Sequence, residues 1–316
     1  MRLYQFGYAR NAHDYSQAIN PRVSQLEVAP EVAEALRAGR PVVALESAVF
    51  THGLPADAGR EALRRQREAC QEHGVVPAVV AVHEGRLRVG LTPGQTDALI
   101  RHDGAAKVSP WNLAASLQSP GYGGVTVAGT LMACARAGIT VMSTGGIGGV
   151  HPSEVEDVSA DLLELSRRRV GVVCAGPKSV LDVRRTLERL ETLGVPVIGW
   201  RSDRLAGFYR SLTDLPVTAR AETVHDLAVI VRDHWSFGGA GVLISQPLPE
   251  ELALPDEELG AALAALHSDA ASGWKVTPTQ LAALRDRLGP SVIDANLALL
   301  GRNASLAARL AVELAQ

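Results

Sequence analysis

The sequence has few cysteines, little net charge and no long apolar run, and each shortage excludes a class of protein. Cys70, Cys134 and Cys174 are odd in number, far apart and in no metal-ligand spacing, a usage typical of buried, reduced thiols in the cytoplasm. The net charge is −3, so nothing indicates binding to nucleic acid or to an anionic membrane. No stretch reaches the roughly 18 apolar residues of a membrane span, and the first residues show no signal-peptide apolar region. We therefore expect a cytoplasmic protein that binds neither nucleic acid nor membrane.

Several widespread catalytic motifs are also missing. The chain has no P-loop, no Cys-x-x-Cys pair, no His-Glu-x-x-His segment and no pattern of a Ser/His/Asp triad. The turn GGIGGVH (145–151) matches a dinucleotide-binding fingerprint only in part, because His151 stands where the third glycine belongs. A nicotinamide cofactor is therefore not expected. The glycines could let backbone N–H groups wrap a phosphate or carboxylate, or they could form a tight turn that packs on a neighbour.

What the chain does have is a regular alternation of strand and helix patterns. Buried strand patterns occur at 41–49, 139–144, 170–176, 195–200 and 240–249, and a hairpin pattern occurs over 75–91. Helix patterns occur at 56–74, 126–138, 155–168, 179–194 and 221–235, and three more follow Pro255. This order predicts an α/β fold, a mostly parallel mixed sheet sandwiched by helices (α/β/α), with a C-terminal helical segment that could cap the sheet. We expect a loosely ordered lead over 1–27 and a single catalytic domain over 28–316.

Chemically useful side chains follow two of these strands. Ligands of such folds bind at the carboxyl ends of the parallel strands, where Glu46 follows VVAL (42–45) and Lys178 follows VGVVCAG (170–176). Lys178 could be a solvated lysine at the start of a helix. It could also be a nucleophile, kept neutral by the helix field and by partial burial. A carboxylate, the glycine turn and a lysine would then meet at one site for a small anionic metabolite.

Two aspartates in VEDVSADLL (155–163) suggest a metal site. The expected helix over 155–168 places Asp157 and Asp161 four residues apart on one face, with Ser159 between them. Two such carboxylates repel each other unless a cation joins them, and Mg²⁺ or Mn²⁺ would suit them. The alternative is that both are acidic residues favoured near a helix start.

Other polar residues have both a functional and a structural interpretation. His151 could be a metal ligand or an acid–base group, or it could be a structural histidine. Lys107 could neutralise a phosphate, or it could lie on the surface. Thr126 and Thr130 share one face of a helix, where they could donate hydroxyl groups to a substrate or serve in capping and packing. His52 lies in a turn and is assigned no chemistry.

Seven segments form a distinctive set, and an eighth follows near the end of the chain. They are VALESAVFTHGLP (43–55), AAKVS (105–109), TVAGTLMACARAGI (126–139), STGGIGGVH (143–151), DVSADL (157–162), VVCAGPKSVLD (172–182), VPVIGW (195–200) and DANLALLGRNASLAARLAV (294–312). In their order and spacing over residues 28–312, they resemble the pseudouridine-5′-phosphate glycosidase family.

The resemblance implies a lyase that reversibly cleaves the C–C glycosidic bond of pseudouridine 5′-phosphate to uracil and ribose 5-phosphate. A C-glycoside has no heteroatom leaving group, so the family uses a lysine that attacks C1′, opens the sugar and forms a Schiff base. By resemblance, Lys178 is the nucleophile and Glu46 is the proton donor. Asp157 matches the position that binds Mn²⁺ or another divalent cation, one ion per subunit, and Asp161 is a neighbouring candidate.

The resemblance also bears on substrate binding and on partners. Together with Thr126 and Thr130, the expected substrate-binding positions are Lys107, Val127, His151, Ser159, Ala160, Asp161 and Asn296. The family implies a homotrimer, a role in pseudouridine degradation and a functional link to a pseudouridine kinase.

Two segments depart from the family pattern. HPSEVED (151–157) is about two residues shorter than the usual loop and has Pro152 in place of a basic residue, and KVSPWNL (107–113) replaces KVSRRDL. Trp111 could stack on a ligand or simply pack. Two alternatives therefore stay open. One is an enzyme of the same fold that acts on a different C-nucleotide or sugar phosphate, and the other is a non-catalytic sensor of a sugar phosphate or nucleotide.

Overall fold

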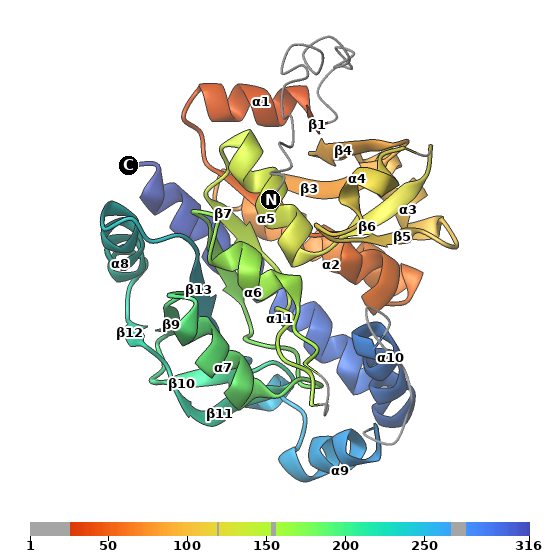
Figure 1. Cartoon of the computed structure of the whole chain (residues 1–316), viewed down its shortest axis with the longest axis vertical. Helices are drawn as coiled ribbons and strands as arrows, with labels where there is room; N and C mark the ends of the chain where they lie inside the picture. The colour runs from red at the N-terminus through yellow and green to blue at the C-terminus, as the bar shows by residue number, and fades with distance from the viewer. Residues whose placement is uncertain (1–25, 119, 153–155, 267–275) are drawn as a thin grey trace, which may run out of the picture.

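A mostly parallel sheet forms the centre of the molecule. The computed structural model describes residues 26–118, 120–152, 156–266 and 276–316. Within them eleven strands form one sheet in the order β1-β4-β3-β2-β7-β8-β13-β9-β12, with β5 and β6 joined to it through β3 (Figure 1). The strands of this sheet are β1 (Leu26–Val28), β2 (Val42–Leu45), β3 (Val76–His83), β4 (Arg86–Val89), β5 (Ala106–Val108), β6 (Tyr122–Val125), β7 (Val141–Ser143), β8 (Gly171–Cys174), β9 (Val197–Trp200), β12 (Ala219–Ala221) and β13 (Val242–Ser245). From β3 to β12 all neighbours are parallel, so the carboxyl ends of these strands lie along one edge.

Helical layers cover both faces of the sheet. Because side chains alternate along a strand, Val43 and Leu45 of β2 face one hydrophobic core while Val42 and Ala44 face the other. Helices α2, α8 and α11 close the first core, and α1, α5, α6 and α7 close the second (Figure 1). The helices are α1 (Pro30–Arg37), α2 (Ala56–Gln71), α3 (Pro93–Arg101), α4 (Leu113–Ser116), α5 (Val127–Ala137), α6 (Ala160–Leu165), α7 (Val183–Thr192), α8 (Val224–Ser236), α9 (Asp256–Leu266), α10 (Val276–Leu288) and α11 (Pro290–Leu314). The predicted α/β/α sandwich is confirmed.

The last helix is part of the sandwich and does not cap the sheet. α11 contacts α2 and α8 on either side and packs on β2, β7 and β8, so it runs along the face of the sheet (Figure 1). The prediction of a three-helix cap is therefore wrong for α11, whose apolar residues are needed to close the first core. α9 and α10 lie at the lower end of the molecule in Figure 1. Residues 267–273 of the helix expected after Pro255 lie outside the described residues.

Two predicted helices begin later than expected. α6 begins at Ala160, because the Ser159 hydroxyl accepts a hydrogen bond from Asp161 N (3.2 Å) and ends the extended segment before it. α7 begins at Val183, because the Asp182 carboxylate accepts a hydrogen bond from Arg185 N (2.9 Å). At the other end of the chain the first strand begins at Leu26, two residues before the expected domain start, and residues 1–25 lie outside the described residues.

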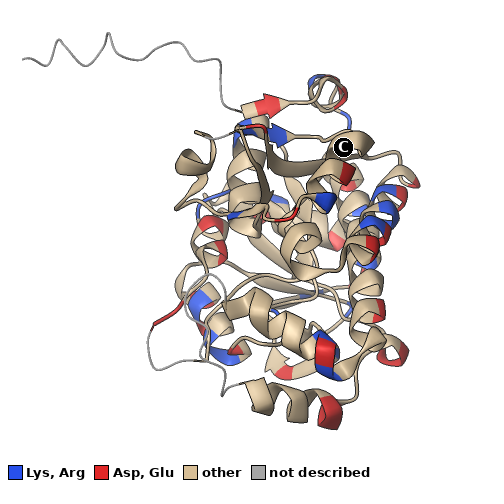
Figure 2. Ribbon diagram, turned by 90° about the vertical axis from the view of Figure 1, so that its right-hand side faces the viewer, with Lys and Arg blue, Asp and Glu red and all other residues tan. Residues whose placement is uncertain are grey.

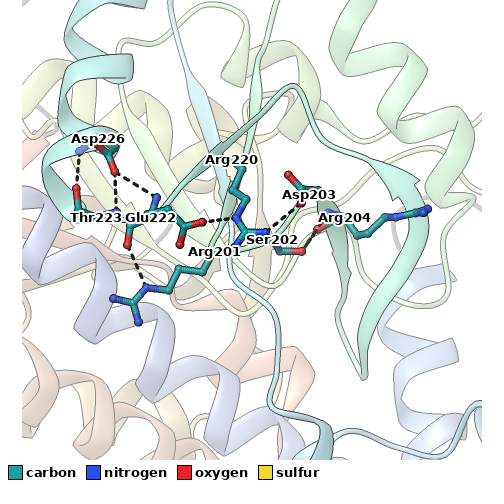
Figure 3. A network of polar contacts seen from close by, with 8 residues as sticks. All are labelled: Arg201, Ser202, Asp203, Arg204, Arg220, Glu222, Thr223 and Asp226. Carbon is teal, nitrogen blue, oxygen red and sulfur yellow. Dashed lines mark hydrogen bonds and ion pairs between the residues drawn. The ribbon is translucent and has the colours of Figure 1, made fainter.

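Residues 201–220 form structure that the sequence patterns missed, and the helix predicted over 221–235 follows as α8. A two-stranded antiparallel ribbon, β10 (Arg204–Gly207) with β11 (Arg210–Pro216), precedes β12 at the edge of the main sheet. Arg220 of β12 pairs with Asp203 (3.0 Å) and with Glu222, while Thr223 and Asp226 cap each other at the start of α8 (Figure 3). Exposed ion pairs of this kind contribute about 0–1 kcal/mol each. The network therefore fixes the turn from β12 into α8. Its ion pairs are exposed, so it serves the fold of this turn.

Charges of both signs are mixed over the surface. In the view of Figure 2 blue and red segments are interspersed along the described ribbon. None of the helices in the described part of the chain has the length and apolar character needed to span a bilayer. Cys70, Cys134 and Cys174 are free and buried, as predicted, and burial raises the pKa of each thiol to about 12.

Asn303 of α11 holds the turn after β7, and its removal should destabilise the fold. Its buried Nδ2 donates to the carbonyls of Thr144 (2.9 Å) and Gly145 (3.4 Å). Asn303→Ala leaves both carbonyls without this donor, so we expect the free energy of unfolding to fall by about 1–3 kcal/mol. Urea unfolding checks this, with Arg302→Ala at an exposed position of the same helix as control. Equal losses in the two variants would contradict the assignment.

Candidate active site

Two adjoining cavities lie at the carboxyl edge of β2, β7 and β8. The residues that line both cavities are Glu46, Ala48, Lys107, Lys178 and Thr277. The first cavity is completed mainly by the turn after β2, the β10–β11 ribbon and α10, and it includes Asn296 of α11. The second cavity is completed by Thr126, Val127, His151, Asp157, Ser159, Ala160 and Asp161. The fold therefore brings together every predicted site residue except Thr130.

Thr130 is a correction. It lies inside α5 with no exposed surface, and its hydroxyl has no hydrogen-bond partner among the described residues. One helical turn away, Thr126 lines the second cavity, where it accepts a hydrogen bond from Gly129 N and donates one to the Ser109 hydroxyl (3.3 Å). Thr126 and Thr130 do share a helix face, but only the Thr126 end of that face is open to the cavity. Thr130 is fully buried and does not reach a ligand.

Glu46 is a buried carboxyl at the end of β2. Only 5% of its surface is exposed, and the hydroxyl of Thr144, at the end of β7, donates a hydrogen bond to its Oε1. Burial raises the pKa of Glu46 above its ordinary value, against the opposing effect of the Lys178 charge. A carboxyl that keeps its proton to higher pH can serve as a general acid.

Lys178 is placed by the strand before it, which corrects the expectation of a lysine at a helix start. Pro177 forms a parallel bridge with Ile147, and Lys178 N donates to the Ile147 carbonyl (3.1 Å). The following helix begins only at Val183, so a helix field cannot act on the amine in the way proposed from sequence. The side chain instead reaches both cavities from the backbone just past β8.

The two cavity lysines are unusual in this chain. It contains three lysines, Lys107, Lys178 and Lys275, and its other cationic side chains are arginines. Two of the three therefore lie at one site. Burial lowers the pKa of Lys107, and the charge of Lys178 lowers it further. Amines, unlike guanidinium groups, can lose a proton and act as nucleophiles near neutral pH, which makes their location chemically meaningful.

Asp161 and Asp157 do not form the predicted pair on one helix face. Asp161 is buried, and its two carboxylate oxygens accept hydrogen bonds from Ala128 N (2.9 Å) and Gly148 N (2.7 Å). Asp157 lies before α6, on the wall of the second cavity, with its Oδ2 3.4 Å from His151 Nδ1. Asp161 is thus engaged within the protein, and Asp157 is the carboxylate available to a ligand.

His151 links the second cavity to α10. Its Nε2 lies 2.8 Å from the Thr277 hydroxyl, and its backbone N donates to the Asp157 carbonyl (2.9 Å). Burial lowers the pKa of His151, and the Asp157 carboxylate opposes that effect. The imidazole therefore favours its neutral form and holds the Asp157 segment and α10 together at the rim.

The glycine turn after β7 packs closely against neighbouring segments of the protein. Its donors at Ile147, Gly148, Val150 and His151 are all bonded to groups of the protein. A Cβ at Gly148 would lie 2.3 Å from the Ser159 hydroxyl, so glycine is required for close approach. Gly148 therefore serves tight packing, while Gly145 and Gly146 line the first cavity, where their backbone can still meet a ligand.

Sequence reasoning missed several residues that line or shape the cavities. Thr144 stands directly after β7 in the STGG motif, where position at a strand end was the available signal. His52 lines the first cavity from a π-helical turn, η1 (Val49–Gly53), although it had been assigned no chemistry. Tyr209, whose hydroxyl accepts a hydrogen bond from Asn296 Nδ2 (2.6 Å), comes from the unpredicted ribbon. Trp111 is 70% exposed and lines the second cavity, so of the two alternatives left open for it the structure favours a side chain available to a ligand.

The fold and the cavities define an α/β protein in which a buried acid and two lysines face a ligand site at the carboxyl edge of a parallel sheet. The family described as indigoidine synthase A like protein matches residues 31–313. The pseudouridine-5′-phosphate glycosidase of Methylobacterium nodulans is 43% identical over 296 residues, which cover 92% of this chain and 88% of that protein. That of Symbiobacterium thermophilum is 44% identical over 301 residues, with coverages of 92% and 97%.

Two solved structures share this fold. An indigoidine synthase A-like protein from Thermotoga maritima superposes with a TM-score of 0.85 at 34% identity, covering 92% of this chain and 97% of that chain. The prealnumycin C-glycosynthase AlnA, in complex with ribulose 5-phosphate, gives 0.83 at 36% identity with the same coverages. The chain belongs to the indigoidine synthase A-like family of pseudouridine-5′-phosphate glycosidases, and the resemblance seen in the sequence is confirmed.

The raised pKa of Glu46 should make stability depend on pH. The folded state holds this proton more tightly than the unfolded chain, whose value is about 4.5. The stabilisation is complete below that pH and is lost as pH rises through the folded pKa, by up to about 1.4 kcal/mol per pH unit. Urea unfolding across pH should show this loss in the wild type and not in Glu46→Gln. Exposed Glu72→Gln is the control, and parallel curves for wild type and Glu46→Gln would refute the prediction.

Proposed function

We propose that the protein is a pseudouridine-5′-phosphate glycosidase that reversibly cleaves pseudouridine 5′-phosphate to uracil and ribose 5-phosphate. One observation supports this above the others: Lys178 and the buried acid Glu46 line the same cavities at the strand ends, in a chain 43–44% identical to relatives of that name. The two groups supply a nucleophile and a proton, the requirements for breaking a C–C bond to a carbon leaving group.

The chemistry assigns one step to each group. The Lys178 nitrogen attacks C1′ and displaces O4′, which takes a proton as the sugar ring opens. Glu46 then protonates C5 of uracil, and the nitrogen lone pair expels the base as the C1′–C5 bond breaks. The product on the protein is an imine between Lys178 and the open ribose phosphate, which water hydrolyses to ribose 5-phosphate and free lysine. Thr144 fixes one oxygen of Glu46 and leaves the other to transfer the proton.

Substrate binding divides between the cavities. The second cavity, with Lys107, Val127 and the segment Ser159–Asp161, holds the ribose phosphate, because it combines a buried cation with the first turns of α5 and α6. Asn296 lies in the first cavity beside Glu46 and Lys178, where uracil must lie for C5 to receive a proton. Asp161 acts here by holding the cavity wall.

A divalent cation, Mn²⁺ by family resemblance, fits the second cavity in one way. No group of three or more His, Cys, Asp or Glu among the described residues could enclose a metal. Asp157 presents a carboxylate at the cavity wall, and hard cations of this kind can bind through one or two carboxylates with water and substrate oxygens completing the shell. Asp157 would hold the ion, one per subunit, and the ion would neutralise charge on the bound sugar phosphate.

The wider context follows the family. The enzyme acts in the cytoplasm as a homotrimer, and a pseudouridine kinase supplies its phosphorylated substrate for degradation. Buried, free cysteines support the compartment.

A second candidate keeps the lysine chemistry and changes the molecule joined to the sugar. AlnA, a C-glycosynthase by name and 36% identical, shares the fold and was solved with ribulose 5-phosphate. In this chain the exposed Trp111 stands at the rim of the second cavity. A panel of sugar phosphates and C-nucleotides distinguishes the candidates, because only the first requires turnover of pseudouridine 5′-phosphate.

Uracil release from pseudouridine 5′-phosphate with Mn²⁺ tests the proposal and the role of Lys178. We expect release by the wild type and a loss of at least about three orders of magnitude in kcat for Lys178→Ala, because the nucleophile is removed. Lys178→Arg is the sharper variant, since it keeps the charge without a nucleophilic amine and should be equally inactive.

Borohydride trapping with ribose 5-phosphate gives a second measurement on the same lysine. Mass spectrometry should find the adduct on Lys178, and the small number of lysines in the chain makes the assignment direct. Substantial activity in a folded Lys178→Arg variant would show that Lys178 serves only as a charge. A folded wild type that traps no sugar and releases no uracil would instead support the sensor alternative.

Asp157 should dominate Mn²⁺ affinity in the absence of substrate. Asp157→Asn removes the carboxylate charge, so we expect Mn²⁺ affinity to fall by about tenfold or more. Paramagnetic resonance of free Mn²⁺ measures this without any activity assay. Glu156→Gln is the matched control, because that neighbouring carboxylate is exposed and pairs with Arg189 (2.8 Å). Unchanged binding in Asp157→Asn would place the ion elsewhere.

A further inference from the structure

His52 connects two parts of the site that are distant in sequence. It lies in η1, the π-helical turn that follows Glu46, and its ring lines the first cavity. Nδ1 lies 2.6 Å from the Thr51 hydroxyl, and Nε2 lies 3.1 Å from the carbonyl of Ala105. Ala105 directly precedes β5, the strand that carries Lys107. One imidazole therefore joins the segment after the acid to the strand of the second lysine.

The Ala105 carbonyl can only accept, so the bond to it requires a proton on Nε2. The Thr51 hydroxyl beside Nδ1 also reaches the carbonyls of Ser47 (3.3 Å) and Ala48 (3.4 Å). Burial lowers the pKa of His52, and the charge of Lys107 adds to this effect, so the neutral ring is favoured. Both nitrogens are bonded to the protein. His52 therefore shows carbon edges to the cavity and is not placed to exchange a proton with a ligand.

Lys107 lies on a short strand, where the His52 bond to Ala105 adds to the bond that Asn112 Nδ2 donates to the Lys107 carbonyl (3.0 Å). β5 has three residues and pairs with β6 alone among the described strands, with Lys107 in register with Gly124. The same turn packs on that partner: a Cβ at Gly124 would lie 1.9 Å from the Thr51 hydroxyl oxygen. Ser47 also joins the turn to β6, since its hydroxyl accepts from Val125 N (2.9 Å).

We propose that His52 is a positioning residue that holds β5 through Ala105 and thereby fixes Lys107 opposite Glu46 and Lys178. The inference deepens the proposed function, because it rests on Lys107 binding the phosphorylated sugar. A π-helical turn beside a site is a common way to aim a side chain that a regular helix would misplace. The result is a cavity whose acid and phosphate-binding lysine keep their separation.

The first test is kinetic. His52→Leu removes the donor to Ala105, and we expect KM for pseudouridine 5′-phosphate to rise about tenfold while kcat changes less than about threefold. His52→Gln places an amide N–H near the position of Nε2 and should restore KM to within about threefold of wild type. Thr51→Val removes the partner of Nδ1, together with the hydroxyl's longer bonds to Ser47 and Ala48, and keeps the bond to Ala105, so it should give a smaller rise than His52→Leu. A loss confined to kcat, or a failure of His52→Gln to rescue the KM of His52→Leu, would overturn the proposal.

A double-mutant cycle with Lys107→Ala tests the route of the effect. If His52 acts through Lys107, His52→Leu should raise KM no further in the Lys107→Ala background, whereas independent sites would give multiplied effects. Multiplied effects would overturn the proposal.

Hydrogen exchange of the free protein separates this inference from the reaction itself. Amides of β5 should exchange faster in His52→Leu and return to the wild-type rate in His52→Gln, with β9 unchanged in both. Unchanged β5 exchange in His52→Leu would overturn the positioning role. If β5 exchanges faster in His52→Leu but the wild type releases no uracil, the positioning role stands and the proposed reaction is rejected.

Discussion

The carboxylate of Asp161 joins three elements that the site requires. Its oxygens accept hydrogen bonds from Ala128 N at the start of α5 and from Gly148 N in the glycine turn, while Asp161 itself lies in the first turn of α6. A buried carboxylate without donors would be strongly unfavourable, and two backbone N–H groups satisfy it. The second cavity is therefore built around a charge already committed to structure. That commitment explains why Asp157, at the open wall, is the carboxylate left for a ligand.

The chemistry depends on a balance between burial and charge. Desolvation raises the pKa of Glu46 even though Lys178 opposes it, and desolvation with the charge of Lys178 lowers the pKa of Lys107. The Glu46 carboxyl is thus shifted toward its protonated form, as a general acid requires. The positive charge of Lys107 is disfavoured by the same burial, so an anionic ligand beside it would be stabilising.

The comparison with relatives separates what the fold provides from what the loops select. Proteins named as pseudouridine-5′-phosphate glycosidases and a C-glycosynthase all resemble this chain over more than nine-tenths of its length. A fold does not by itself define a substrate. The strand ends supply the lysine and the acid, whereas the departures at Pro152 and Trp111 lie on segments around the second cavity, where a ligand is selected.

The sequence by itself determined the α/β/α class, the strands that end at Glu46 and Lys178, and the family, because buried parallel strands and strand-end residues leave local patterns. Tertiary structure decided the rest. Whether α11 caps or joins the sandwich depends on packing against α2 and α8, and the starts of α6 and α7 depend on caps at Ser159 and Asp182. Helix periodicity suggested that Thr130 faces a ligand, but it cannot show which part of a helix face is open to a cavity, and Thr130 is fully buried. The contacts that fix the site residues in place join segments distant in sequence, such as His52 and Ala105, and these contacts appear only in the folded structure.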